Sequence, residues 1–158
     1  MARIRFAEAQ DTGTILRFIR ALAAYEKLEQ ECFAEEDSLR TNLFGPKTYA
    51  EVLLIEEEGD ATGFALFFHN FSTFLGKPGL YLEDLFVDPA HRGKGHGKAL
   101  LKRLAELAVA RGCGRLEWSV LDWNQPSIDF YLSLGARPME DWTIYRLDGA
   151  KLENLARV

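Results

Sequence analysis

The chain has 158 residues, the size of one ordinary domain, and we predict a single domain over residues 1–158. Hydrophobic residues make up 47% and charged residues 27% of it, as in soluble globular proteins. No apolar run reaches the roughly 20 residues that a membrane helix needs, and the N-terminus lacks an apolar secretory segment. The net charge of −5 argues against nucleic acid as the main partner. We therefore expect no nucleic-acid partner, no membrane partner and a cytoplasmic location.

The first half of the chain alternates between strand and helix patterns. Apolar residues recur every three or four positions between Asp11 and Leu28, which is the spacing of an amphipathic helix. Turn-forming residues at 58–60 separate two apolar runs and predict a hairpin. The elements expected here are a strand at 3–7, helices at 11–28 and 35–43, and strands at 50–55, 63–69 and 80–87.

The second half begins with a glycine-rich loop and then the strongest helix pattern of the chain. Leu100, Leu101, Leu104 and Leu107 lie on one stripe of that helix, and Gly112 follows as a stop signal. The elements expected next are a strand at 116–121, a helix that opens at 124–127 and ends at 134–135, strands at 136–140 and 143–147, and a helix at 151–156. This order predicts an α/β fold with a mixed sheet and helices on both faces.

The glycine-rich loop, residues 92–98, has the features of an anion site. Its glycines alternate along the chain and allow backbone conformations that other residues resist. The first N–H groups of the following helix have no partner within the helix, and the helix dipole favours negative charge there. The spacing fits neither the P-loop nor the dinucleotide fingerprint. The alternative is a loop that only joins a strand to a helix.

Charge is unevenly spread along the chain. Acidic residues crowd positions 26–37, and basic residues crowd positions 92–103. Two readings stay open for these clusters. They are solvated helix faces, or they are an acidic rim for a cationic substrate and a basic rim for an anionic cofactor.

The loop matches the pattern Arg/Gln-x-x-Gly-x-Gly/Ala at Arg92, Gly95 and Gly97, and it resembles the pyrophosphate loop of the GNAT acetyltransferase superfamily. The stretches 24–28, 81–87 and 120–131 are similar to the diamine acetyltransferases of that superfamily, which include spermidine/spermine and thialysine acetyltransferases. The resemblance implies a GNAT-type fold with a mostly antiparallel central sheet, and a homodimer. It also implies an acetyl-CoA-dependent N-acetyltransferase that acts on a small primary amine.

The resemblance further assigns roles to individual residues. It implies that Tyr131 is the general acid and that Glu83 faces the amine. The amine pocket would be lined by Tyr25, Glu26 and Trp142, with Asp84 as a further candidate for amine binding. Acetyl-CoA would be bound along the pantetheine arm by Leu85, Phe86 and Val87, at the pyrophosphate by Arg92, Gly93, Lys94, Gly95, His96, Gly97 and Lys98, and near the thiol by Asn124 and Ser127.

The chemistry of amine acetylation agrees with these roles. A free alkyl ammonium has a pKa near 10, so a base must take its proton, directly or through water. Glu83 and Asp84 are neighbours on one strand, and regular alternation would point them to opposite faces. A backbone N–H near Leu85 would donate to the acetyl carbonyl if a bulge interrupted the strand.

Each residue assignment and the function keep an alternative. Glu83 and Asp84 would otherwise make ordinary hydrogen bonds at a strand end, Glu26 would be a surface carboxylate, and Tyr131 would be a core aromatic. The acceptor would otherwise be a protein or peptide. The domain would otherwise be a non-catalytic acyl-CoA-binding module, since fold alone does not decide function.

Overall fold

A computed structural model describes residues 1–158 in two compact units, Met1–Ser119 and Val120–Val158, and each unit is described by itself. The first unit holds a five-stranded sheet in the order β1-β2-β3-β4-β5. The pairs β1–β2, β2–β3 and β3–β4 are antiparallel, and the pair β4–β5 is parallel. The strands are β1 (Ala2–Phe6), β2 (Glu51–Glu57), β3 (Asp60–Ser72), β4 (Lys77–Val87) and β5 (Leu116–Trp118), and the helices are α1 (Thr12–Tyr25), α2 (Glu36–Phe44) and α3 (His96–Ala110).

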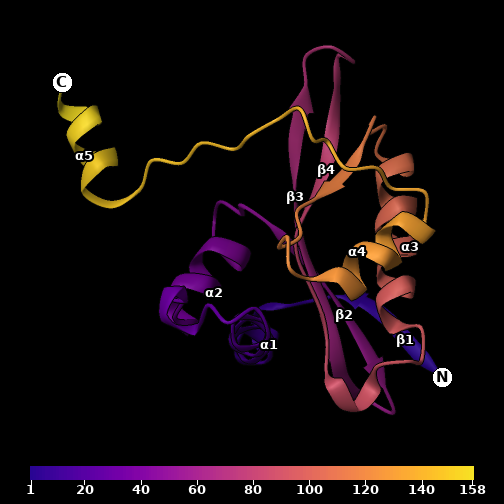
Figure 1. The fold of residues 1–158 in the computed structure, drawn as a ribbon. Coiled ribbons are helices and arrows are strands. Elements are labelled where there is room, and N and C mark those ends of the chain that lie inside the picture. Colours follow the sequence, from indigo (N-terminus) through magenta and orange to yellow (C-terminus); the bar gives the residue numbers. More distant parts are fainter. The chain divides into compact units, whose positions relative to one another are not determined.

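Helices α1 and α2 cover one face of this sheet, and α3 covers the other (Figure 1). The α1 face is held by a cluster of buried apolar side chains in which the ring of Phe18 stacks on that of Phe64 at 5.5 Å. Burial of such side chains stabilises the fold by about 2 kcal/mol each. The cluster consists of Ile15, Phe18, Leu22, Leu43, Val52, Leu54, Phe64, Leu66 and Phe86.

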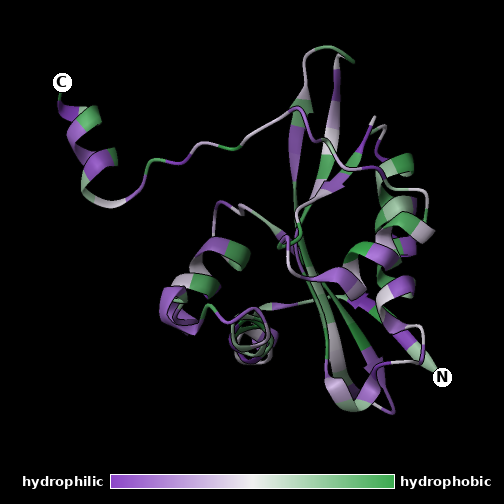
Figure 2. Cartoon of the chain, viewed as in Figure 1, coloured by the Kyte–Doolittle hydropathy of each residue, from purple (hydrophilic) through white to green (hydrophobic).

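The α3 face is built from the alternate residues of the same strands. Val52 and Leu54 belong to the α1 cluster, so the buried Leu53 points to the opposite face of β2. Leu100 and Leu104, four residues apart on α3, are fully buried. Figure 2 shows how much of β2 and β3, in the middle of the sheet, is hydrophobic. The sheet is covered on both faces, as expected from the sequence.

Two bulges interrupt the strand pairing. Between β2 and β3, Ile55 pairs with Gly63 but Glu56 pairs with Ala61, so Thr62 is an extra residue. Between β3 and β4, Leu66 pairs with Asp84 but Phe67 pairs with Leu82, so Glu83 is an extra residue. A bulge changes which side chains share a face, and both of these lie beside predicted site residues.

The predicted helices and strands of the first unit are confirmed, with shifted ends. The first helix ends at Tyr25 rather than Leu28, because Lys27 adopts a left-handed φ of 62° and Leu28 N–H donates to Ala23 O at 2.8 Å. No glycine marks this end in the sequence. The fifth strand is shorter than predicted and ends at Trp118 rather than at residue 121.

The second unit contains α4 (Gln125–Ser133) and α5 (Gly149–Arg157). The strands predicted at 136–140 and 143–147 are wrong, because the segment between these helices contains no strand. Alternating residues such as those at 143–147 favour an extended chain, but a strand also needs a hydrogen-bonded neighbour, which composition cannot supply. None of the helices has the length and apolar character needed to cross a membrane.

Candidate active site

The loop before α3 has the backbone conformation of an anion site. Gly93 and Gly95 have left-handed φ angles of 80° and 82°, and Gly95 is the N-cap of α3. A Cβ added at either position, or at Gly97, would have no heavy atom within 4 Å. These glycines therefore serve no internal packing contact. They leave the backbone N–H groups at the start of α3 accessible to a ligand.

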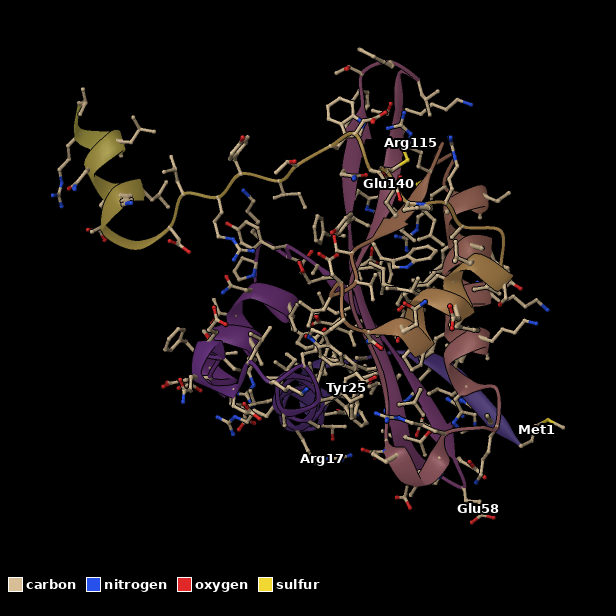
Figure 3. The ribbon with its side chains drawn as sticks, viewed as in Figure 1. Met1, Arg17, Tyr25, Glu58, Arg115 and Glu140 are labelled. Carbon is tan, nitrogen blue, oxygen red and sulfur yellow. The ribbon has the colours of Figure 1, made fainter.

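Arg92 connects this loop to α1 and to the end of β4. Its Nε donates to Val87 O at 3.0 Å. Its guanidinium carbon lies 5.1 Å from the centre of the Tyr25 ring and 5.4 Å from that of Phe86. The ion pair of Arg17 with Asp88 at 3.4 Å also joins α1 to the residue that follows β4, and Figure 3 labels Arg17 and Tyr25 on α1. The structure thus brings a predicted amine-pocket residue, Tyr25, to a predicted cofactor residue, Arg92.

The bulge in β4 places Glu83 and Asp84 on the same face. Asp84 pairs with Leu66, whose side chain belongs to the α1 cluster, so Asp84 faces α1. Leu82 pairs with Phe67 and faces the other way, so alternation alone does not place the extra residue Glu83. After burial, its charge is the largest cause that raises the pKa of Asp84 and that of Glu26, just after α1, so the Glu83 carboxylate lies on the α1 side. The expectation that Glu83 and Asp84 point to opposite faces is therefore wrong. The sequence carries the two carboxylates, but no feature of it indicates the bulge.

Glu26, just after α1, completes a cluster of three carboxylates on this face. Burial, followed by the charges of Glu83 and Glu26, raises the pKa of Asp84 to about 7. Burial, followed by the charge of Glu83, also raises the pKa of Glu26 above its ordinary value. The negative charges of Glu83 and Glu26 oppose the loss of the proton from Asp84, so Asp84 is partly protonated near pH 7. A bound ammonium would relieve this repulsion, and the cluster can accept a proton from an amine.

The loop, the bulge in β4 and the acidic cluster agree with what comparisons to known proteins show. Residues 17–136 match the Acetyltransferase (GNAT) family. The chain belongs to the GNAT acetyltransferase family. GNAT acetyltransferases use acetyl-CoA as cosubstrate, and this chain is accordingly an N-acetyltransferase. The GNAT fold predicted from the sequence is confirmed.

Three relatives are similar over nearly their whole length. A Bos taurus thialysine N-epsilon-acetyltransferase is 39% identical over 164 residues, covering 97% of this chain and 96% of the bovine protein. An Arabidopsis thaliana L-ornithine N5-acetyltransferase, NATA1, is 31% identical and covers 99% of this chain and 89% of its own. An integron cassette protein of V. cholerae has a TM-score of 0.84 at 27% identity, covering 99% and 98% of the two chains.

Four predicted residues of this GNAT chain lie in the second unit. Asn124 is the N-cap of α4, and its Oδ1 accepts a hydrogen bond from Ser127 N–H at 3.4 Å. Tyr131 lies on α4, and Trp142 lies between α4 and α5. The capping role of Asn124 agrees with the predicted helix start. The roles of these four residues toward cofactor and substrate stay predictions.

Two residues that contact the GNAT loop were not expected from the sequence. Glu57, at the end of β2, binds Lys94 of the loop, and Thr62, the bulge residue of β3, contacts His96. Neither belongs to a motif, and Thr62 faces the loop because of a bulge. The sequence shows only that a His, His96, lies in the glycine-rich loop. The structure shows that it is buried, and a buried imidazole needs polar partners.

The raised pKa of Asp84 predicts a pH-dependent stability. Its pKa is higher folded than unfolded, so the folded state binds the extra proton and the free energy of unfolding falls as pH rises from about 4 to about 7. Replacing Asp84 with Asn removes this loss. We expect the gain in unfolding free energy over wild type to be larger at pH 7 than at pH 5 by up to about 3 kcal/mol, measured by urea denaturation. The control, Asp60→Asn at the exposed start of β3, should show no such trend. A stability gain for Asp84→Asn that is the same at pH 5 and pH 7 would contradict the assignment.

Proposed function

We propose that this enzyme acetylates the side-chain amine of a small basic amino acid similar to thialysine, or a diamine or polyamine of similar length. The observation that carries this acceptor class is the cluster of Glu26, Glu83 and Asp84 on the α1 face, next to the glycine loop. Several carboxylates suit an acceptor with more than one ammonium group. The thialysine type is favoured because the bovine relative is named for it and matches over nearly its full length.

Acetyl-CoA would supply the acetyl group as an activated thioester. The N–H groups at residues 93–98 would bind its pyrophosphate, with Arg92 and Lys98 adding positive charge. The backbone of Leu85, Phe86 and Val87 would bind the pantetheine arm as a strand partner. The short pairing of β5 supports this, because β5 pairs only with Leu80–Leu82 of β4 and leaves that edge of residues 85–87 without a strand partner.

The acidic cluster would prepare the amine for attack. Its carboxylates would hold the acceptor ammonium and remove one proton, with Glu83 as the acceptor of that proton, directly or through water. Asp84 and Glu26 would tune the charge of the cluster, and Glu26 with Tyr25 would contact the far ammonium group. Tyr131 would donate its hydroxyl proton to the leaving thiolate, and Asn124 and Ser127 would contact the cofactor near that sulfur.

A substrate panel tests the acceptor. We expect CoA release with thialysine and lysine-like amino acids to exceed release with a basic peptide by at least about tenfold in kcat/KM, because a compact acidic cluster favours a small cation. The panel contains thialysine, ornithine, lysine, putrescine, spermidine and a basic peptide. Glu26→Gln should raise the KM of diamines more than that of a monoamine, and Glu29→Gln, an exposed carboxylate in the turn after α1, is the matched control. A preference for the peptide would reject the small-amine acceptor.

We also propose that the two units form one catalytic domain and that the enzyme is a homodimer. The family match at residues 17–136 runs across the boundary between the units, which supports a single domain. A two-fold dimer is the commonest assembly of soluble enzymes. Light scattering of the purified protein would measure the assembly directly.

A further inference from the structure

The buried His96 is the first residue of α3 and one of its ring nitrogens contacts the Thr62 bulge. His96 is 6% exposed and Thr62 is 1% exposed. Thr62 Oγ1 lies 3.2 Å from Ile55 O, to which it donates, and 3.1 Å from His96 Nδ1. Thr62 Oγ1 is therefore within hydrogen-bond distance of His96 Nδ1, with the donor set by the tautomer of the imidazole. The backbone carbonyl of Thr62 accepts in turn from Asp88 N–H at 2.8 Å, so Thr62 holds both ends of the segment that carries the loop.

The Glu57 carboxylate contacts three further groups of the same segment. Its carboxylate lies 3.1 Å and 3.4 Å from Lys94 Nζ, 3.3 Å from His91 Nδ1 and 3.5 Å from His96 Nε2. The hydrogen bond from Lys94 is the first cause that lowers the pKa of Glu57, so this carboxylate stays charged at neutral pH. The rings of His91 and His96 are nearly parallel, with centres 6.3 Å apart.

The loop that these contacts hold is otherwise flexible by composition. Gly93, Gly95 and Gly97 restrict the backbone very little, so a precise array of N–H groups needs support from outside the loop. Thr62 and Glu57 belong to the β2–β3 hairpin, whose strands are paired from Glu51 with Phe67 to Glu57 with Asp60. They reach the loop through contacts with His96 and Lys94, and neither has a heavy atom within 4 Å of a Cβ added at one of these glycines.

We propose that Thr62 and Glu57 are positioning residues for acetyl-CoA: acting through His96 and Lys94, they fix the N–H groups that bind the pyrophosphate. This inference rests on the proposed assignment of residues 93–98 as the pyrophosphate loop. It adds that Thr62 and Glu57 of the β2–β3 hairpin control the affinity for the cofactor. The contacts of Thr62 and Glu57 include none of the carboxylates proposed to bind the amine.

The test compares two acetyl donors in the variant Thr62→Val. Valine has the shape of threonine and leaves His96 Nδ1 without its hydrogen-bond partner. We expect kcat/KM for acetyl-CoA, and the affinity for CoA in calorimetry, to fall about tenfold, the effect of one lost buried hydrogen bond. S-acetylpantetheine lacks the pyrophosphate, so its kcat/KM and the KM of the amine should stay within about twofold of wild type.

Further variants separate positioning from a general loss of structure. Thr62→Ser keeps the hydroxyl and should restore most of the affinity for CoA. Glu57→Gln should also weaken CoA binding, because Lys94 and both imidazoles lose their charged partner. The matched control is Glu51→Gln, which removes a similar carboxylate at the other end of β2, where it pairs with Arg111 at 2.6 Å. That variant should bind CoA as wild type does.

Three results would overturn the proposal: unchanged CoA affinity in Thr62→Val, equal losses with both donors, or tighter CoA binding in Glu57→Gln. The last would mean that Glu57 competes with the phosphates for Lys94. Failure of the proposed function can be distinguished from failure of this inference. If the wild type acetylates no amine but binds CoA in calorimetry, the proposed function fails and the variants are compared by their CoA affinity alone. Thermal melting of each variant shows whether it is folded.

Discussion

Replacing Gly95 with valine is expected to lower the affinity for acetyl-CoA by at least about 100-fold. Gly95 has a φ of 82°, which costs an L-residue about 1–2 kcal/mol and is least tolerated by a β-branched one. The valine side chain would also project into the open space in front of the loop, where the pyrophosphate is proposed to bind. Loss of the loop conformation and steric blocking therefore act together. Calorimetry with CoA measures the result.

The matched control for Gly95→Val lies at the opposite end of the same helix. Gly112 follows α3, has a φ of 72° and also faces open space. Gly112→Val should carry a similar loss of stability but keep its CoA affinity within about twofold, because no ligand group is proposed there. Equal losses of CoA affinity in both variants would contradict the assignment of the loop.

Replacing Tyr131 with phenylalanine is expected to lower kcat by about 100-fold or more while leaving CoA affinity unchanged. The proposed role of its hydroxyl is to protonate the leaving thiolate, and general acid catalysis contributes about 10²–10⁴-fold. Phenylalanine keeps the ring and its contact with Phe130, whose centre lies 5.7 Å away, so α4 should retain its packing. Steady-state kinetics with saturating acetyl-CoA and thialysine measures the effect.

Tyr49→Phe, a hydroxyl removed from the exposed segment between α2 and β2, is the control and should leave kcat unchanged. A Tyr131→Phe enzyme whose kcat stays within about threefold of wild type would contradict the role as general acid and favour the alternative, a core aromatic. A loss confined to the KM of acetyl-CoA would instead indicate a binding role.

Local patterns in the sequence predicted α3 and the loop before it. The leucines of α3 recur at helical spacing, and this stripe is the buried one in the structure. Gly93 and Gly95, expected to relax the backbone, have the left-handed φ angles that only glycine adopts readily. Both features depend on neighbours within a few residues, which a sequence displays directly.

Pairing between distant strands was predicted less well. The hairpin of β2 and β3 was expected, but its bulge at Thr62 was not, because a bulge depends on the register of two strands and on the contact with His96. The strands predicted at 136–140 and 143–147 failed for a related reason, since alternation favours an extended chain without supplying a partner.

The sequence by itself determined the family, the positions of most elements and the chemical groups at hand: a glycine loop for an anion and carboxylates for an amine. Only the tertiary structure decided which carboxylates act together. One extra residue in β4 turns Glu83 to the face of Asp84, and the end of α1 brings Glu26 to the same place. Side-chain direction along a strand changes with every residue of register, so a single bulge, invisible in the sequence, sets the composition of the acidic cluster.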